Sequence, residues 1–265
     1  MYATNYHRAS SLADAVRLQS SSDEAKYVSG GMTLIPTMKQ RLAAPADLVD
    51  LRHVAELKGI SVSGNRVRIG AGTTHYEVST SAELKAVCPA LCHLASHIGD
   101  PHVRHMGTIG GSIANNDPAA DYPSAMLALG ATIVTNTREI PAGDFFTGLF
   151  ETALEDGEIV VAVTFDAPAK AGYSKFPNPA SRYAMAGVFV AKAGDGSVRV
   201  AVTGAGSNGV FRHDGLEAAL AAAWSPEAAA SVDIDATDLL SDLHGSAEYR
   251  ANLVRVMAKR AVAAA

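Results

Sequence analysis

The sequence predicts an α+β chain built from two domains, and two observations lead to this fold class. The part before residue 170 mixes short strands and helices with glycine turns, whereas the later part has three successive strands followed by two helices. Residues 166–172, which join the two parts, are rich in proline, alanine and glycine. We therefore expect one domain at residues 1–170 and another at residues 171–265.

The first fifty-odd residues have the pattern of a small unit of helices and strands. A serine pair at residues 10–11 precedes apolar residues at helical spacing, which predicts a capped helix. Short strands are expected at residues 26–28 and 48–51. Residues 32–41, between these strands, have a helical pattern that a proline interrupts. A glycine turn therefore lies inside this unit, directly after its first strand.

The middle of the chain begins with a hairpin and continues with helices. Strands are expected on both sides of the turn pair Gly64-Asn65, because apolar and polar residues alternate there. Residues 81–98 have a helical pattern, which Pro89 divides into two helices. A further helix and two strands are expected at residues 122–129, 131–135 and 158–165. The residues of the last strand alternate, which is typical of a half-buried strand.

The C-terminal part should contain a three-stranded sheet and helices. Strands are expected at residues 173–176, 183–191 and 198–203, and helices at about residues 215–223 and from residue 246 to the end. Strands that follow one another before any helix are typical of an α+β domain.

The composition indicates a sizeable core and few surface charges. Of the 265 residues, 48% are hydrophobic and 18% are charged, below the roughly 25% of soluble domains. This fits a chain that buries surface against partners and equally an ordinary alanine-rich protein. The net charge is −5 and basic residues are scattered, so no nucleic-acid surface is expected. The start lacks a signal-peptide pattern and no apolar run reaches the roughly 18 residues of a membrane span, so we expect a cytoplasmic chain.

Two glycine pairs are the most informative features for function, and they occur in Ser29–Thr33 and Thr108–Ser112. Paired glycines allow positive φ and leave no Cβ to block a ligand, so backbone N–H groups can converge on an anion. Two such loops could hold a pyrophosphate from both sides, with nearby hydroxyls as extra donors. Most glycine pairs in turns are structural, and neither loop matches the G-x-G-x-x-G or Walker pattern. The loops alone therefore indicate no more than a phosphate cradle.

The cysteines and histidines do not form a recognisable metal site. Cys88 and Cys92 are too few for an iron–sulfur cluster, and we interpret them as small buried apolar residues. His93 and His97 have the spacing of a helical metal site, but no carboxylate stands between them in the manner of H-E-x-x-H. With the two histidines that follow, they are interpreted as a solvated or partner-facing patch.

Asp117 and Asp121 have a spacing that would suit paired carboxylates in acid–base chemistry. No nucleophile pattern accompanies them, and the prolines beside them favour turns and helix starts. We interpret Asp117 as a turn residue and Asp121 as a cofactor-binding residue. No catalytic residue is expected on this chain.

Four segments of the chain resemble the flavin subunits of carbon monoxide dehydrogenase, xanthine dehydrogenase and related molybdenum hydroxylases. Residues 27–39 are similar to the AGGQSLLPMMK segment of this family. Residues 100–123, which contain the second glycine pair, are similar to its second FAD segment. Residues 173–188 and 246–250 resemble two later stretches. The four matches follow the order of the family and extend over nearly the whole chain.

The resemblance implies an architecture as well as a cofactor. Residues 1–170 would form an FAD-binding domain of the vanillyl-alcohol-oxidase type, with subdomains of about residues 1–56 and 57–170 and FAD between them. Residues 171–265 would form an α+β domain with a three-stranded sheet. Backbone groups of the two glycine loops would hold the FAD pyrophosphate.

The resemblance also implies which residues contact FAD. These are Val28, Ser29, Gly30, Gly31, Met32, Thr33, Leu34, Ile98, Thr108, Ile109, Gly110, Gly111, Ser112, Asp121, Val160 and Lys175. Asp121 would accept a hydrogen bond from a ribityl or ribose hydroxyl, because its charge excludes contact with phosphate. Ile98 would pack near the adenine, and Val160 and Lys175 would lie beside the isoalloxazine ring. The Lys175 cation would favour the anionic reduced flavin, and the alternative is a surface lysine after a strand.

Finally, the resemblance implies a division of labour among three chains. This chain would pass electrons from 2Fe–2S clusters on a small subunit through FAD to an external acceptor. The substrate would be oxidised at a molybdenum cofactor on a large subunit, in a dimer of heterotrimers, so the residues that select carbon monoxide, an aldehyde, a purine or an N-heterocycle would lie on another chain. Two alternatives stay open: a free-standing FAD oxidoreductase with its own substrate pocket, and a non-catalytic nucleotide-binding module.

Overall fold

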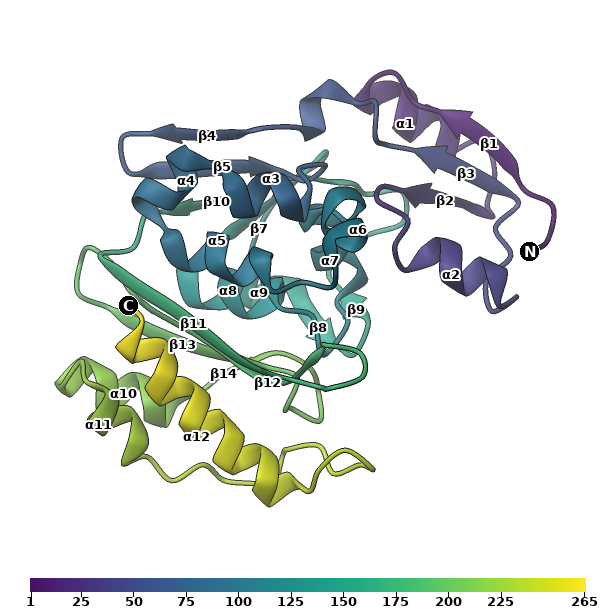
Figure 1. Cartoon of the computed structure of the whole chain (residues 1–265). Helices are drawn as coiled ribbons and strands as arrows, with labels where there is room; N and C mark the ends of the chain where they lie inside the picture. Colours follow the sequence, from purple (N-terminus) through teal and green to yellow (C-terminus); the bar gives the residue numbers. More distant parts are fainter.

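The computed structural model describes all 265 residues, and its strands form three larger sheets and one small one (Figure 1). The larger sheets follow one another along the chain, within residues 5–50, 60–166 and 170–212. In Figure 1 the first sheet lies at the upper right, the second extends from the upper left to the centre, and the third lies below it, with the C-terminal helices at the bottom. This mixture of helices and largely antiparallel sheets confirms the predicted α+β fold class.

The first sheet is parallel, with the order β1-β3-β2. Its unit contains β1 (Asn5–Arg8), α1 (Leu12–Gln19), β2 (Ala25–Val28), α2 (Leu34–Lys39), β3 (Asp47–Asp50) and the 3-10 turn η1 (Ala55–Leu57). Helix α1 begins as predicted, because the Ser11 hydroxyl accepts a hydrogen bond from the Asp14 N–H at 3.1 Å. Contrary to the prediction, Pro36 does not interrupt α2, because it lies in the first turn, where an N–H has no intrahelical partner.

The second sheet is antiparallel, with the order β4-β5-β10-β6-β7. Its strands are β4 (Ile60–Ser63), β5 (Arg66–Gly70), β6 (Thr132–Thr135), β7 (Glu139–Pro141) and β10 (Val160–Asp166), and a separate hairpin consists of β8 (Phe146–Gly148) and β9 (Glu151–Thr152). The helices of this part are α3 (His75–Thr80), α4 (Ala82–Val87), α5 (Pro89–Ser96), α6 (Pro101–Met106), α7 (Ile109–Asn115), α8 (Tyr122–Leu129) and α9 (Ala142–Phe145). The turn at Gly64-Asn65 and the helix break at Pro89 are confirmed.

Strand β10 differs from the predicted half-buried strand, because both of its faces are covered. Val163 packs into the core of the second sheet. Ile159, just before the strand, and Val161 pack instead with Val49 and Leu51 of the first unit. Val161 and Val163 would share one face of a regular strand, but the register shifts between Val160 and Ala162, and the two side chains enter different apolar clusters. This contact joins the first unit to the second sheet.

The third sheet is antiparallel, with the order β11-β12-β13-β14. Its unit contains β11 (Lys170–Pro177), β12 (Ala184–Lys192), β13 (Val198–Thr203), β14 (Phe211–Arg212), α10 (Asp214–Ala222), α11 (Pro226–Ala230) and α12 (Ala247–Ala263). The three expected strands are present, and the two-residue strand β14 is added at one edge. One face packs on α12, where Val188 and Val202 lie in a cluster with Val254 and Met257.

The other face of the third sheet belongs to the same core as the second sheet. Tyr173, Phe189 and Ala201 are buried in a cluster with residues of α5 and α8, such as Leu94 and Met126. The three units are therefore packed against one another through apolar side chains. The domain boundaries at about residues 56 and 170 stay predictions.

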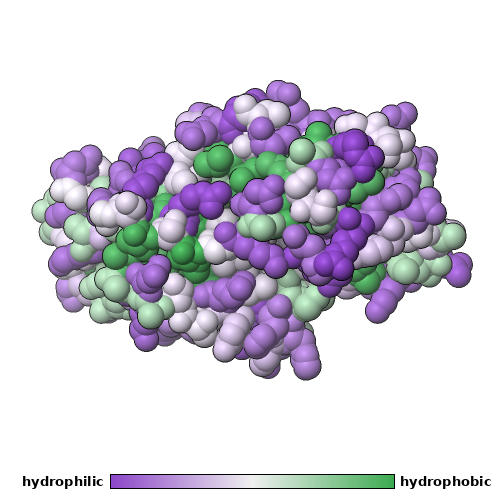
Figure 2. Space-filling model, turned by 90° about the horizontal axis from the view of Figure 1, so that it is seen from above, coloured by the Kyte–Doolittle hydropathy of each residue, from purple (hydrophilic) through white to green (hydrophobic).

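The surface carries both polar and apolar groups. Seen from above, it is largely polar, with apolar side chains gathered in small areas between polar ones (Figure 2). None of the helices combines the length and the apolar character that crossing a lipid bilayer requires.

Candidate cofactor-binding site

A cavity of about 860 Å³ lies where both glycine loops meet the start of β10 and the connection between β11 and β12. Its volume is within the range of small-molecule and cofactor sites. Apart from Ile109, every residue that the sequence predicts as a cofactor contact lines this cavity. Ile109 is fully buried in the core of the second sheet.

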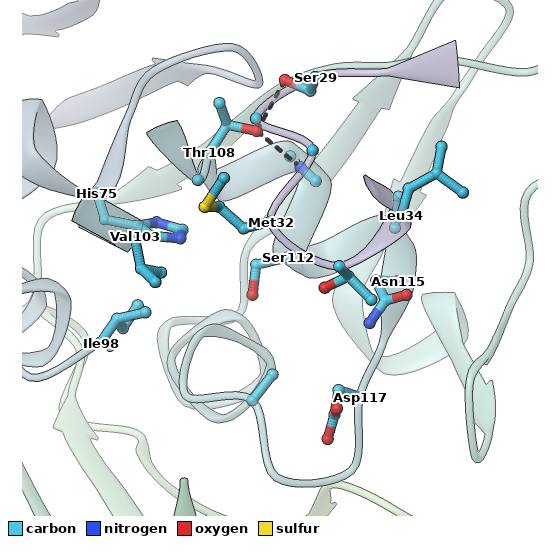
Figure 3. A pocket seen from close by; sticks show the side chains of 18 of the residues that line it. Ser29, Met32, Leu34, His75, Ile98, Val103, Thr108, Ser112, Asn115 and Asp117 are labelled. Carbon is cyan, nitrogen blue, oxygen red and sulfur yellow. Dashed lines mark hydrogen bonds between the residues drawn. The ribbon is translucent and has the colours of Figure 1, made fainter. Parts of the chain in front are cut away.

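The two glycine loops are in direct contact, although they are far apart in the sequence. The Ser29 and Thr108 hydroxyls are hydrogen-bonded at 3.0 Å across 79 residues (Figure 3). A Cβ atom at Gly30 would lie 2.1 Å from the carbonyl oxygen of Met106. Only glycine therefore allows the first loop to lie against the segment that leads into the second loop.

The first loop presents unpaired backbone donors to the cavity. Gly31 has a φ of +69°, which turns the chain between β2 and α2. None of the N–H groups from Gly30 to Thr33 has an acceptor within the chain, and all four residues line the cavity. The Thr33 hydroxyl does not cap α2. An anion in the cavity would therefore meet a loop whose N–H groups are free.

The second loop differs, because four of its N–H groups, from Ile109 to Ser112, are already used. Ile109 and Gly110 donate to the carbonyl oxygens of Thr73 and Ala71, at 3.0 and 2.8 Å. The N–H of Gly111 donates to Thr108 Oγ1 at 3.1 Å. The N–H of Ser112 donates to the Thr108 carbonyl oxygen at 3.0 Å. The expectation that the backbone of both loops offers donors therefore needs correction for these four groups.

Ser112 is the side chain that keeps this second loop polar on the cavity side. Its hydroxyl has no hydrogen-bond partner within the chain and points into the space below Met32 in Figure 3. Gly110 serves packing, since a Cβ atom there would lie 2.4 Å from the Ala71 Cβ. The second loop therefore contributes a hydroxyl, and its glycine lets α7 approach the end of β5.

Asp121 and Lys175 form a buried ion pair at the wall of the cavity. Lys175 Nζ lies 2.9 Å from Asp121 Oδ1, and the two side chains are 4% and 6% exposed. Nζ also donates to the His97 carbonyl oxygen at 2.9 Å. The Tyr173 hydroxyl donates a further hydrogen bond to Asp121. The interpretation of Lys175 as a surface lysine is therefore wrong.

This ion pair has a mixed electrostatic environment. Burial raises the pKa of Asp121, whereas the Lys175 ammonium and the Tyr173 hydroxyl act in the opposite direction. An ammonium group has three N–H donors, and three acceptors of the chain lie within 3.2 Å of Lys175 Nζ: the His97 carbonyl oxygen and both carboxylate oxygens of Asp121. Lys175 lines the cavity, so a ligand there would lie beside an ammonium group that the chain itself already binds.

The cavity as a whole has no excess of positive charge. Its charged lining residues are Lys26, Asp100, Asp117, Asp121, Glu158, Lys175 and Arg182. Glu158 is paired with Arg138 at 3.0 Å, and this guanidinium lowers the pKa of Glu158 to about 2. A bound phosphate group would therefore depend on neutral N–H and O–H donors more than on cations.

Several residues that line the cavity were not predicted as contacts, and His75 and Tyr183 are the aromatic polar residues that were missing from that prediction besides Tyr27. His75 is 5% exposed, and burial lowers its pKa to about 4. Tyr183 lines the cavity and is 48% exposed. Neither belongs to a motif with a recognisable spacing, because each reaches the cavity through the packing of its element.

The cysteines and histidines lie outside this cavity, except for His75. Cys88 and Cys92 are free and buried, which confirms the interpretation as small apolar residues. Burial raises the pKa of the Cys88 thiol to about 12. The rings of His93 and His97 are 4.3 Å apart on the exposed side of α5. The structure contains no group of three or more side chains that is arranged to hold a metal ion.

Comparison with known proteins gives a consistent result. Residues 2–168 match the family described as "FAD binding domain in molybdopterin dehydrogenase". The chain is 36% identical to the carbon monoxide dehydrogenase medium chain of Hydrogenophaga pseudoflava over 276 residues, which cover 98% of this chain and 96% of that one. It is 33% identical to the nicotine 6-hydroxylase medium subunit of Paenarthrobacter nicotinovorans, with 98% and 96% covered.

The fold is similar to that of solved structures as well. A chain of reconstituted CO dehydrogenase from Oligotropha carboxidovorans superposes with a TM-score of 0.90 and 35% sequence identity. The match covers 100% of the present chain and 98% of the other. The similarity therefore includes the C-terminal unit, which the family match at residues 2–168 does not reach.

Proposed function

The chain belongs to the family of FAD-binding domains of molybdopterin dehydrogenases, and from this premise we propose that it is the medium subunit of a molybdenum-containing hydroxylase. It is a component of an oxidoreductase, and its cofactor is FAD. Relatives of similar length are named for carbon monoxide, nicotine and 6-hydroxypseudooxynicotine. The substrate therefore varies among complexes whose medium subunits are alike.

The observation that carries this proposal is the row of four unpaired N–H groups from Gly30 to Thr33 in a cavity large enough for FAD. These groups would hold the pyrophosphate without adding charge. The hydroxyl of Ser112 would bind from the opposite loop. Because the two loops touch through Ser29 and Thr108, both sides of the cradle are fixed before the cofactor enters.

The walls on either side of this cradle would hold the rest of the cofactor. Asp121 would accept a hydrogen bond from a ribityl or ribose hydroxyl, and the Lys175 ammonium would lie beside the isoalloxazine ring. Ile98 and Val160 would supply apolar contact to its rings. Bound FAD supplies a ring that takes up and releases electrons, and the side chains of this chain position it and exclude water.

The rest of the pathway would lie on partner chains. We place 2Fe–2S clusters on a small subunit and the molybdenum cofactor on a large subunit, in a dimer of heterotrimers. The two cysteines of this chain are buried in apolar surroundings, which agrees with clusters that are held elsewhere. Free cysteines are also typical of a reducing compartment, and we place the complex in the cytoplasm. The final electron acceptor would be a small molecule from outside the complex.

Purification of the full chain, alone and with its partner subunits, tests this function. The chain alone should be yellow, contain FAD after release and chromatography, and oxidise none of the candidate substrates. In the complex, substrate should bleach the flavin absorption. A chain that oxidises a substrate by itself would instead be a free-standing oxidoreductase. A folded, colourless chain that takes up no FAD would contradict the proposal.

A further inference from the structure

Only three buried side-chain nitrogen or oxygen atoms of the chain lack a hydrogen-bond partner: His75 Nδ1, Tyr122 Oη and Arg250 Nε. The first two are neighbours, with ring centroids 5.4 Å apart. An unpaired buried polar group costs about 1–3 kcal/mol, and native proteins keep few of them. Since Nδ1 has no partner, Nε2 is the ring nitrogen of His75 that is left to bind a group in the cavity.

The main chain holds His75 firmly in place. It is the first residue of α3, and the Thr74–Glu77 capping box fixes the start of this helix through hydrogen bonds of 2.7 and 3.2 Å. The N–H of His75 donates to the Gly107 carbonyl oxygen at 3.0 Å. The imidazole is thus attached to the segment that leads into the second glycine loop.

Gly107 provides the space that the imidazole occupies. A Cβ atom at residue 107 would lie 2.6 Å from His75 Nε2. Gly107 itself lines the cavity, so the Nε2 edge of the ring is the one on the cavity side. Figure 3 shows His75 beside Val103 and facing Met32, with Ile98 on the same side of the cavity. A polar ring edge is therefore set among apolar side chains.

The protonation state of this ring follows from its surroundings. Burial, followed by the nearby Arg104 cation, lowers the pKa of His75 to about 4, so the ring is neutral at pH 7. A neutral imidazole carries one N–H. Because the buried Nδ1 has no acceptor, the hydrogen belongs on Nε2, where it faces the cavity.

We propose that His75 is a cofactor-binding residue whose Nε2–H donates a hydrogen bond to an uncharged ring or hydroxyl of bound FAD. This inference rests on the proposed FAD site and adds a contact that no motif of the chain indicates. The neutral donor suits a heterocycle or a sugar, and the apolar neighbours Ile98, Val103 and Met32 suit the flat face of a ring. The isoalloxazine half and the adenosine half both offer such acceptors, and the choice of ligands below separates them.

The test uses three substitutions in the full-length chain. His75→Gln keeps an N–H near the position of Nε2, His75→Asn places one near Nδ1, and His75→Leu removes both. FAD affinity should fall about tenfold in the Asn and Leu variants, as for one lost hydrogen bond of about 1.4 kcal/mol. The FAD affinity of the Gln variant should stay within about threefold of that of the wild type. His102→Gln, on the exposed side of α6, is the matched control.

Titrations with FMN and with ADP then locate the contact. If the Leu and Asn variants bind FMN more weakly than the wild type, the acceptor lies on the flavin half. If they bind ADP more weakly, it lies on the adenosine half. Thermal unfolding without ligand checks that the variants are folded. In the wild type, the Nε2–H resonance of nitrogen-15-labelled His75 should move when FAD is added, whatever the variants do.

Several results would overturn the inference. One is unchanged FAD affinity in folded Leu and Asn variants, another is a Gln variant as weak as Leu, and a third is an Nε2–H resonance that FAD does not move. In each of these cases the wild type still binds FAD, so the proposed function stands. A wild-type chain that does not bind FAD would overturn both.

Discussion

The two glycine loops have similar sequences, but they differ in whether their backbone N–H groups are free to bind a ligand. In the first loop, the N–H groups from Gly30 to Thr33 are free, whereas those from Ile109 to Ser112 in the second all have acceptors within the chain. The first loop is followed by a helix whose N-cap residue makes no side-chain bond, while Thr108 caps α7 through its hydroxyl. A glycine pair in a turn therefore does not define what the turn offers to a ligand.

The reason for each glycine differs as well. Gly30 permits contact with the Met106 carbonyl group, and Gly31 permits a positive φ. Gly110 permits close packing of α7 on Ala71. One loop thus uses its glycines to shape a binding surface, and the other uses one to bring a helix close to a sheet. This comparison leads to predictions in which binding and stability separate.

The largest effect is expected for Gly30→Ala. Its Cβ would lie 2.1 Å from a backbone oxygen, so the two loops must move apart and the cradle must open. We expect FAD affinity to fall about 100-fold, the upper end of what overpacking costs. Titration of the purified chain measures this. Gly143→Ala, where no atom lies within 4 Å of the new Cβ, is the control. Wild-type affinity in the Gly30 variant would contradict the role of this loop.

The next largest effect is expected for Gly110→Ala, and it should appear in stability. The new Cβ would clash with Ala71, which should lower the free energy of unfolding by about 2 kcal/mol. Because the N–H groups of this segment face acceptors within the chain, FAD affinity of the folded fraction should change little. Chemical denaturation and FAD titration, carried out on the same protein, separate the two. If the Gly110 variant loses FAD affinity but no stability, then Gly110 serves binding rather than packing, and the contrast between the two loops is wrong.

A smaller effect is expected when the ion pair of Lys175 and Asp121 at the cavity wall is broken. Lys175→Met leaves the buried Asp121 carboxylate without its cation, so negative charge on the flavin becomes less favourable. The flavin midpoint potential should fall by about 30 mV, which is about 1.4 kcal/mol for a two-electron couple. Lys170→Met, at the exposed start of the same strand, is the control. An unchanged potential would show that Lys175 does not influence the ring.

The smallest effect is expected for Ser112→Ala. This change removes the free hydroxyl of the second loop and should weaken FAD binding about fivefold, as for a hydrogen bond of about 1 kcal/mol. Thermal unfolding should be unaffected, because the hydroxyl has no partner within the chain. If the affinity does not change, then the first loop alone holds the cofactor.

The sequence by itself determined the features that depend on near neighbours. The cap at Ser11, the helix break at Pro89 and the turn at Gly64-Asn65 each result from a few consecutive residues. The family resemblance also identified FAD, because the motif residues of the two loops lie in short segments. Nearly all of the predicted contact residues then proved to line one cavity.

Only the tertiary structure decided which atoms of these residues are free. The N–H groups of Ile109 and Gly110 are used because the carbonyl groups of Thr73 and Ala71, from a distant segment, lie against them. Lys175 forms an ion pair with the carboxylate of Asp121, which lies 54 residues earlier in the sequence. Hydrogen bonding and burial depend on groups from distant segments that packing brings together. The local sequence therefore does not show which acceptor or counter-ion a residue will meet.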